Sequence, residues 1–307
     1  MEINSKKLIT HNGSFHADDI FACATLSLVL ERAGEKFEVF RTRDEEIIKT
    51  GDYVFDVGGI YDADKNRFDH HQIGGAGKRE NGIEYSSFGL VWKKFGKSIC
   101  EDEEASNELD RKIVTPIDAV DNGMDIVISK YKNIYPYNAD QVFLAYSPTW
   151  KESENEIEMD GIFFEQVEKA KEILKREIKV AVDDAEGKRI IIKSYEDSED
   201  KRIIELDISF PRYLFQKTLS KFSEPLYAVY PGAIGDNWKV EAIVKDPNTF
   251  ESRKPFPEAW RGFLNNDPRL KELTGVSDAL FSHRTGFLIT SSSKEGAIKL
   301  AQIALQS

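Results

Sequence analysis

Most of the histidines in this 307-residue chain lie in two short stretches that also carry aspartates. Residues 10–19 read THNGSFHADD and residues 67–71 read RFDHH, and together they hold four of the five histidines. The carboxylate of Asp56 lies between them in the sequence, directly after an apolar run at 53–55. Imidazole nitrogens and carboxylate oxygens are common ligands of divalent metals in proteins. The clustering therefore predicts a site for one or two divalent metal ions.

Asp56 is predicted to be the centre of this site, because two divalent ions about 3.5–4 Å apart can share one carboxylate as a bridge. Mixed ligation by nitrogen and carboxylate oxygen suits Mn²⁺, with Zn²⁺, Co²⁺ or Mg²⁺ as alternatives. The predicted cofactor is therefore a pair of Mn²⁺ ions. One ion is predicted to take His11, His16 and Asp56, and the other Asp18, Asp56, His70 and Asp121.

The chemistry that such a pair favours is the hydrolysis of phosphoesters, because two metal ions activate a shared water and neutralise charge on the phosphate. His71 is outside the predicted ligand sets, and we expect it to contact a phosphate oxygen or to donate a proton to the leaving oxygen. Asp69 and Asp118 are further catalytic candidates. Each has an alternative, since Asp69 is placed to orient a neighbouring imidazole and Asp118 to cap a helix end. His11 alone would be as compatible with a core histidine as with a ligand.

The fifth histidine belongs to a second cluster of polar residues, in the last quarter of the chain. His283 and Arg284 lie beside Gly286, a combination suited to holding a phosphate. Arg253 lies upstream, in a stretch that mixes cations with aromatic residues as base-stacking surfaces do. Trp260 in the same region is better explained as a buried core residue. The predicted substrate-binding residues are therefore His283, Arg284, Arg253 and Gly286.

The elements that must position the metal ligands alternate between strands and helices. Strands are predicted at 7–10, 36–43 and 53–55, and helices at 17–33 and 44–49. This alternation is typical of a parallel sheet, in which functional groups gather at the carboxyl ends of the strands. His11 and Asp56 directly follow two of these strands, so we expect them at the same edge of the sheet.

The length of the chain is sufficient for two domains. Residues 1–155 are predicted to form a metal-binding catalytic domain, residues 156–186 a connecting helix, and residues 187–307 a smaller substrate-binding domain. In the last part we expect strands at 189–193, 203–208, 226–230 and 238–245, a helix at 211–222, and a final helix opened by a capping box of Ser292 and Glu295. The predicted fold class is α/β, with a parallel-sheet N-terminal domain joined by a long helix to a smaller α+β C-terminal domain.

The composition is that of a folded globular protein, with 40% hydrophobic and 31% charged residues and no apolar run of the length that crosses a membrane. Cys23 and Cys100 lack metal-ligand spacing and are expected to be buried thiols, so a cytoplasmic protein without a membrane partner is predicted. The net charge of −12 is uneven: residues 1–186 hold 24 Lys and Arg against 38 Asp and Glu, and residues 187–307 hold 18 against 16. This division fits a metal enzyme that acts on an anion, although the charge alone is explained as well by an acidic, solvated surface.

The motifs together resemble a known family along essentially the whole chain. They are THNGSFHADD at 10–19, DVGG at 56–59, RFDHH at 67–71, DAVDNG at 118–123, PEAWRG at 257–262 and HRTGF at 283–287. This set is similar to the Myg-type family (melanocyte-proliferating-gene relatives) and, more widely, to the DHH phosphoesterase superfamily. The resemblance implies a DHH-type domain and a smaller substrate-binding domain with a cleft between them. It also implies a metal-dependent 3′-to-5′ exonuclease that acts on short single-stranded RNA, with DNA as the alternative substrate.

One departure from the superfamily pattern concerns the first motif. That motif commonly reads His, three residues, Asp, one residue, Asp, whereas this chain has His11, four residues, His16, one residue and Asp18. The change affects the geometry expected of the first metal and its preference for softer ions. Two other functions remain open from the sequence: a hydrolase of a small phosphate compound such as a dinucleotide or pyrophosphate, and a metal-stabilised RNA-binding module without turnover. The oligomeric state is also open, a homodimer included.

Overall fold

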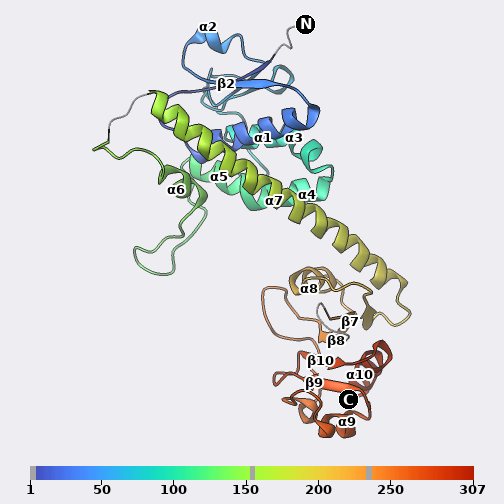
Figure 1. The fold of residues 1–307 in the computed structure, drawn as a ribbon. Helices are drawn as coiled ribbons and strands as arrows, with labels where there is room; N and C mark the ends of the chain where they lie inside the picture. The colour runs from blue at the N-terminus through green and yellow to red at the C-terminus, as the bar shows by residue number, and fades with distance from the viewer. Residues whose placement is uncertain (1–4, 153–155, 233–236) are drawn as a thin grey trace. The chain divides into compact units, whose positions relative to one another are not determined.

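The computed structural model describes residues 5–152, 156–232 and 237–307, which divide into two compact units (Figure 1). Unit 1 is Met1–Asp183 and unit 2 is Asp184–Ser307. Each unit contains one five-stranded sheet with both parallel and antiparallel neighbours. The predicted α/β fold class is therefore confirmed. The predicted domain boundary at residue 155 lies outside the described residues.

The sheet of unit 1 has the strand order β2-β1-β3-β5-β4. Its strands are β1 (Lys6–Thr10), β2 (Phe37–Arg41), β3 (Tyr53–Phe55), β4 (Tyr61–Asp62) and β5 (Arg67–Phe68). All neighbouring pairs are parallel except β4 and β5, which are antiparallel. The chain passes from β1 to β2 on one side and then returns to β3 on the other side of β1. Such a reversal of strand order opens a crevice at the carboxyl ends of the two central strands.

Helix α1 (Ala17–Ala33) is the central helix of unit 1, and its predicted bounds are confirmed. It is apolar on nearly every side because it is buried along almost its whole length. Gly34 ends the helix in the left-handed conformation, as expected of a C-terminal glycine. The helix packs most extensively against α3 (Ser87–Cys100), where the rings of Phe21 and Phe88 stack 5.2 Å apart.

The remaining short elements of unit 1 lie between the strands of the sheet or after α3. The region predicted as one helix from 103 to 119 is helical but divided, with a π-helical turn at Asp110–Val114 between two α-helices. The helix after this turn ends at Asp121, one of the predicted metal ligands. These elements are α2 (Glu45–Ile48), a 3₁₀ turn at Ala63–Lys65, α4 (Glu103–Leu109), α5 (Thr115–Asp121) and α6 (Ala139–Leu144).

Helix α7 (Glu156–Asp197) is longer than predicted, and the strand expected at 189–193 is wrong. The run Ile190–Ile192 has high β-propensity, but the residues after 186 continue the helix. Gly187, Ile191 and Tyr195 follow one another at the four-residue spacing of one helix face. Ile191 is buried in the core of unit 2, and Tyr195 packs against the same core. Packing along this face therefore outweighs the local preference for a strand.

Unit 2 contains a sheet with the strand order β6-β7-β8-β10-β9. Tyr227, Phe256 and Trp260 lie in its main core, so the expectation of a buried Trp260 is confirmed. The predicted capping box at Ser292 is wrong by one residue, because Ser293 is the N-cap and its Oγ accepts from the Gly296 amide at 3.0 Å. The elements are β6 (Ile203–Glu205), α8 (Arg212–Leu219), β7 (Tyr227–Pro231), β8 (Trp238–Ala242), a 3₁₀ turn at Glu258–Trp260, α9 (Pro268–Thr274), β9 (Ala279–Ser282), β10 (Leu288–Ser291) and α10 (Lys294–Gln306).

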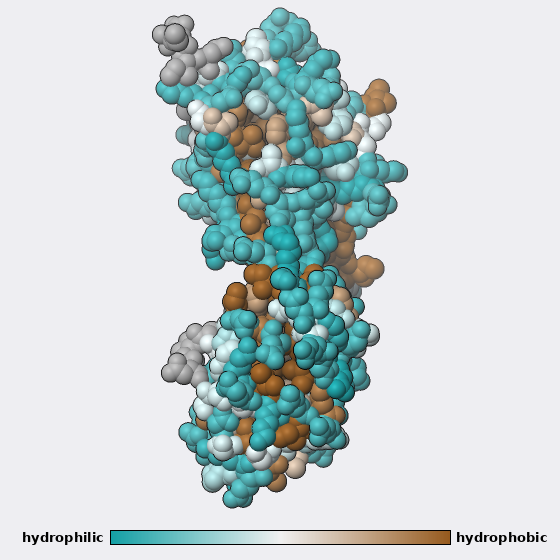
Figure 2. All heavy atoms as spheres, turned by 90° about the vertical axis from the view of Figure 1, so that its right-hand side faces the viewer, coloured by the Kyte–Doolittle hydropathy of each residue, from teal (hydrophilic) through white to brown (hydrophobic). Residues whose placement is uncertain are grey.

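The surface in Figure 2 is mainly hydrophilic on both units, with hydrophobic side chains in small groups between the polar ones. Among the residues that the structure describes, no helix combines the length and the apolar character that a membrane span requires.

Candidate metal centre

Three parallel strands deliver the predicted ligands to one edge of the sheet in unit 1. His11 directly follows β1 and Asp56 directly follows β3, while Asp69, His70 and His71 directly follow β5. Because β1, β3 and β5 are neighbours, their carboxyl ends lie side by side. The expected meeting of His11 and Asp56 at one sheet edge is therefore present in the structure.

Asp56 lies at the centre of this edge and is almost completely buried. Its Oδ2 is 3.0 Å from His11 Nε2, and its Oδ1 is 3.3 Å from His70 Nε2 and 3.6 Å from His71 Nδ1. The Ser87 hydroxyl at the start of α3 donates to the same Oδ1 at 3.1 Å. The backbone of Asp56 has φ +54°, a left-handed conformation that is costly for residues other than glycine. Strain of this kind is concentrated at functional sites.

The start of α1 contributes two further carboxylates. His16 is the N-cap, and its backbone N–H donates to Asp19 Oδ1 at 3.0 Å. The other oxygen of Asp19 lies 3.3 Å from His11 Nε2. Asp18 is fully buried, with its Oδ2 4.0 Å from His70 Nε2. Carboxylates in the first turn of a helix are favoured by the positive end of its dipole.

The described residues include three groups whose ligand atoms lie within 4.8 Å of one another. The structure groups them differently from the predicted sets, because His16 lies with Asp18 and Asp121 rather than with His11. Asp19, which the sequence analysis did not select, takes the place beside His11. The groups are His11, Asp19 and Asp56; His16, Asp18 and Asp121; and Asp56, His70 and His71.

The donor set fits a divalent cation. Both carboxylate oxygens of Asp18 and Oδ2 of Asp19 are buried without a hydrogen-bond donor. An octahedral ion with metal–ligand bonds of about 2.1 Å separates neighbouring ligand atoms by roughly 3.0 Å. The separations of His11 Nε2 from Asp56 Oδ2 and Asp19 Oδ2, 3.0 and 3.3 Å, lie close to that value. The residues of this edge could therefore hold a divalent metal.

The hydrogen bonding of His11 is compatible with a bound cation. Its Nδ1 lies 3.1 Å from the Asn12 carbonyl oxygen, which can only accept. His11 Nδ1 must therefore carry a hydrogen and donate it to this carbonyl oxygen. If the imidazole is neutral, its Nε2 has no hydrogen, and the lone pair of Nε2 faces Asp56 and Asp19. A lone pair that faces two carboxylates is repelled unless a cation or a proton lies between them.

The titration of the carboxylates reflects this crowding of negative charge. Burial, together with the charges of Asp56 and Asp121, raises the pKa of Asp18 well above its usual value. Burial raises the pKa of Asp19 to about 7, against the opposing charge of His11. Burial alone would raise the pKa of Asp56, but the hydrogen bonds and charges of His11 and His70 outweigh it and lower the pKa. Protons or metal ions are needed to balance the charge of this cluster.

Asp69 holds His71 rather than lying among the candidate ligand groups. Its Oδ1 accepts from the backbone N–H of His71 at 3.1 Å and lies 2.8 Å from the ring Nδ1, while Oδ2 accepts from the Gly59 amide at 2.5 Å. The hydrogen bond that the ring donates to Asp69 raises the pKa of His71 to about 8. The His71 side chain is 62% exposed. The imidazole is therefore accessible, and in the metal-free protein the raised pKa favours its protonated form.

Asp118 occupies a different environment from the one predicted for a catalytic residue. It is fully buried, and its Oδ2 lies 2.5 Å from Arg79 Nη1. Its Oδ1 accepts from Ser86 Oγ at 2.6 Å and from the Gly89 amide at 2.9 Å. These contacts cap the N-terminus of α3, because Ser86 makes no side-chain cap of its own. The geometry supports a positioning role for Asp118.

A cavity of about 910 Å³ opens over the metal-ligand edge. His11, His16 and Asp56 line it together with His70, His71 and Asp121. Arg43, just beyond the end of β2, also lines this cavity and was not selected from the sequence. The available signal was its position, since β2 is parallel to β1 and ends at the same edge. An exposed guanidinium beside acidic ligands suits an anionic substrate.

The predicted substrate residues of unit 2 lie in two places. His283, Arg284 and Gly286 belong to the turn between β9 and β10, where the His283 ring Nδ1 accepts from the Thr285 amide at 3.3 Å. Gly286 has φ +73°, and a Cβ there would lie 2.6 Å from Arg261 Nε, so the position requires glycine. Arg284 is exposed.

Arg253 is placed differently from these three residues. Its guanidinium donates to the carbonyls of Phe222 at 2.6 Å, Pro225 at 3.1 Å and Ser220 at 2.7 Å. Both terminal nitrogens are thereby engaged with backbone oxygens that follow α8. These contacts favour a structural role for Arg253 over phosphate binding.

Comparison with known proteins relates almost the whole chain to one family. The family MYG1_exonuc, described as "Uncharacterised protein family (UPF0160)", matches residues 7–305. A MYG1 protein of Schizosaccharomyces pombe is 29% identical to the chain over 98% of both sequences. The MYG1 exonuclease of Bos taurus is 28% identical over 96% of this chain and 84% of that protein, and the MYG1 exonuclease of Homo sapiens is 28% identical over 96% and 85%.

Proposed function

The chain belongs to the MYG1 family (UPF0160), and from this premise we propose that it is a metal-dependent phosphodiesterase, a 3′-to-5′ exonuclease of short single-stranded RNA or DNA. The observation that carries the proposal is the set of buried carboxylate oxygens of Asp18 and Asp19 without donors, beside the imidazole of His11. The relatives that are named exonucleases support the reaction class. The polarity and the preference for RNA follow from the resemblance described above.

We propose Mn²⁺ as the metal and two ions as the number, with Zn²⁺, Co²⁺ or Mg²⁺ as substitutes. The residues that would hold them are those of the three groups apart from His71, with Asp56 common to two groups. When bound, a pair of divalent ions supplies an activated water and neutralises negative charge on a phosphodiester. A donor set of carboxylate oxygens and imidazole nitrogens without thiolates would suit Mn²⁺ and would also accept the three substitutes.

The residues of the chain itself have distinct roles in this proposal. Asp69 fixes the ring of His71, which holds a proton at neutral pH and would transfer it to the leaving oxygen. Arg43 would contact a phosphate oxygen from the rim of the cavity. His283 and Arg284 of unit 2 are proposed to bind a phosphate, because both lie in one turn whose Gly286 admits no side chain.

The proposal is tested with Asp56→Ala and a labelled oligoribonucleotide in Mn²⁺. Release of mononucleotides from one end by the wild type, and its loss in EDTA and in the variant, are the expected results. Mn²⁺ binding by calorimetry should weaken in the variant as well, while circular dichroism checks that the fold is retained. An Asp56→Ala protein that is as active as the wild type would contradict the mechanism.

A profile of activity against substrate length addresses the alternative of a small phosphate substrate. The acidic balance of residues 1–186, 24 basic against 38 acidic residues, favours short substrates over long ones. Hydrolysis of dinucleotides or pyrophosphate without hydrolysis of longer chains would select that alternative. Tight, metal-dependent RNA binding without hydrolysis would instead indicate a binding module.

A further inference from the structure

The segment 126–151 differs in composition from the rest of unit 1. Its 26 residues include six aromatic residues, three lysines and one acidic residue, Asp140. Its net charge is therefore +2, whereas residues 1–186 as a whole carry 24 basic and 38 acidic side chains. The segment follows α5, includes α6, and was not assigned a function from the sequence.

The aromatic side chains of this segment are turned toward solvent. Five of the six are exposed, and only Phe143 is buried. Lysine ammonium groups lie near three of the exposed rings. Lys130 Nζ is 5.8 Å from the Tyr131 ring centre, Lys151 Nζ is 5.1 Å from the Trp150 ring centre, and Lys169 Nζ of α7 is 3.5 Å from the Tyr146 ring centre. We call residues 126–151 with Lys169 the aromatic–lysine face. Its exposed aromatic residues are Tyr131, Tyr135, Tyr137, Tyr146 and Trp150.

The aromatic–lysine face is joined directly to the metal centre. Asp140 in the first turn of α6 accepts a hydrogen bond from the backbone N–H of Ala17 at 3.2 Å. Ala17 is the residue after His16, which lines the metal cavity. The loop that leads from Asp121 into the face begins with Asn122, another lining residue of that cavity.

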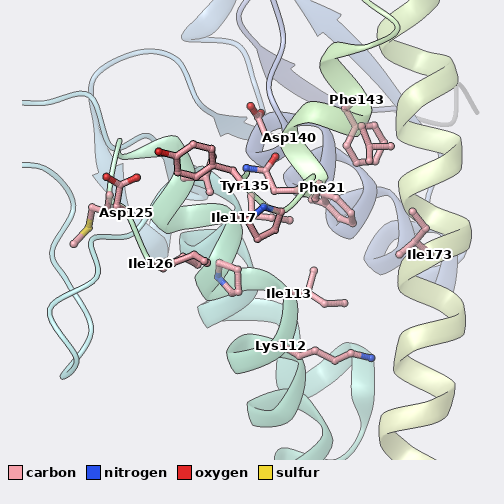
Figure 3. Close-up of a pocket in the computed structure, with 18 of the residues that line it drawn as sticks. Phe21, Lys112, Ile113, Ile117, Asp125, Ile126, Tyr135, Asp140, Phe143 and Ile173 are labelled. Atoms are coloured by element: carbon pink, nitrogen blue, oxygen red, sulfur yellow. The ribbon is translucent and has the colours of Figure 1, made fainter. Parts of the chain in front are cut away.

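An apolar cavity of about 530 Å³ lies between this face, α5 and α7 (Figure 3). Tyr135 and Ile126 lie toward one side of it and Phe143 and Ile173 toward the other (Figure 3). Its lining is mainly hydrocarbon and aromatic ring, with few polar groups. Such a lining suits the flat, weakly hydrated surface of a nucleobase rather than a phosphate.

We propose that the aromatic–lysine face binds the unpaired bases of single-stranded nucleic acid, next to the phosphodiester at the metal centre. The proposal rests on the proposed function, since it extends the same substrate beyond the scissile bond. Exposed aromatic rings stack with bases of any sequence, and nearby lysines neutralise the phosphates that connect them. The face supplies both kinds of group on the otherwise acidic unit 1.

The charges of the face favour nucleic acid over a second copy of the chain. A two-fold contact centred on this face would set the same side chains against one another. Lys130, Lys132 and Lys151 would then meet like charges. The one carboxylate of the segment, Asp140, already accepts from the Ala17 amide. An anionic partner avoids this repulsion.

The test measures binding of a fluorescein-labelled oligouridylate in EDTA, so that hydrolysis does not interfere. Trp150 is 88% exposed. Stacking of a base on the Trp150 indole is expected to quench the fluorescence of that indole. Trp150→Ala should weaken binding of the oligouridylate roughly 5- to 150-fold. Trp150→Phe keeps a ring and should retain most of the affinity. An oligonucleotide of the same length without bases should bind wild type and Trp150→Ala equally.

A matched pair of charge variants tests the lysines. Lys130→Glu should weaken binding and reduce its salt dependence, whereas Lys97→Glu on α3, an exposed lysine outside the face, should do neither. Hydrolysis of a small phosphodiester, bis-p-nitrophenyl phosphate, should be unchanged in Trp150→Ala and Lys130→Glu, because these residues lie outside the metal centre.

Two results would overturn the proposal. One is unchanged oligonucleotide affinity in both Trp150→Ala and Lys130→Glu. The other is light scattering that shows a dimer dissociated by these variants while nucleic acid binding stays intact, which would assign the face to a second copy. Failure of the proposed function would give a different result. Oligonucleotide binding would still be weakened by Trp150→Ala and Lys130→Glu, but the wild type would hydrolyse no oligonucleotide in Mn²⁺.

Discussion

Asp118→Asn distinguishes a positioning role from a catalytic role for this aspartate. The replacement keeps the shape of the side chain but removes its charge. One amide oxygen can still accept from Ser86 Oγ and the Gly89 amide, which leaves the amide NH₂ facing Arg79 Nη1, donor against donor. Arg79 is nearly buried, and among the described residues it retains Asp110, at 2.8 and 3.3 Å, as its ionic partner.

The expected cost follows from this loss. Breaking a buried ion pair by removing one partner costs about 3–5 kcal/mol of the free energy of unfolding. Because Arg79 keeps its ion pair with Asp110, we expect a cost at the lower end of this range, about 3 kcal/mol. For a unit of about this size, 1 kcal/mol corresponds to roughly 2–4 °C in Tm. We therefore expect Asp118→Asn to lower the melting temperature of unit 1 by about 6–12 °C.

The assay combines thermal and urea unfolding, followed by circular dichroism, with activity measured well below the melting temperature. Asp110→Asn is the matched control, because it removes the more exposed partner of the same arginine and should cost about 1 kcal/mol or less. Activity per folded Asp118→Asn molecule should fall less than tenfold. A general acid or base contributes about 10²–10⁴-fold. An unchanged melting temperature with a hundredfold loss of activity would refute the positioning role.

Two further predictions concern the metal centre. In the metal-free protein the His71 imidazole should titrate near pH 8 by NMR, and its pKa should return toward 6.5 in Asp69→Asn. Because the pKa of His71 is raised in the folded state, its contribution to the free energy of unfolding is complete below about pH 6.5 and is lost as the pH rises through 8. Asp18→Asn should raise the free energy of unfolding of the metal-free protein, because the variant removes a buried carboxylate without donors. The same variant should reduce the stabilisation by Mn²⁺, which for the wild type is about 2.7 kcal/mol at 100 times Kd. Urea unfolding with and without Mn²⁺ checks both signs, and a loss of stability in both conditions would contradict the reasoning.

Sequence patterns were sufficient to predict those features of the fold and site that depend on where strands end and on the periodicity of apolar residues in helices. The bounds of α1 and the meeting of His11 with Asp56 follow from such patterns. The role of Asp19 could not be predicted, because adjacent residues on a helix point about 100° apart and the sequence does not show which direction meets His11. The carbonyl contacts of Arg253 could not be predicted for a related reason: its partners lie some thirty residues earlier in the chain and have no sequence signature.

The candidate metal centre combines features that each cost folding free energy. Asp56 is held in a left-handed backbone conformation, which costs on the order of 1–2 kcal/mol. Asp18 and Asp19 bury carboxylate oxygens that no donor contacts. The surrounding packing, including the stacked rings of Phe21 and Phe88 between α1 and α3, supplies the compensating stability. A bound divalent cation would relieve the electrostatic cost and leave only the backbone strain, so the distribution of costs favours a metal-binding function over a purely structural acidic cluster.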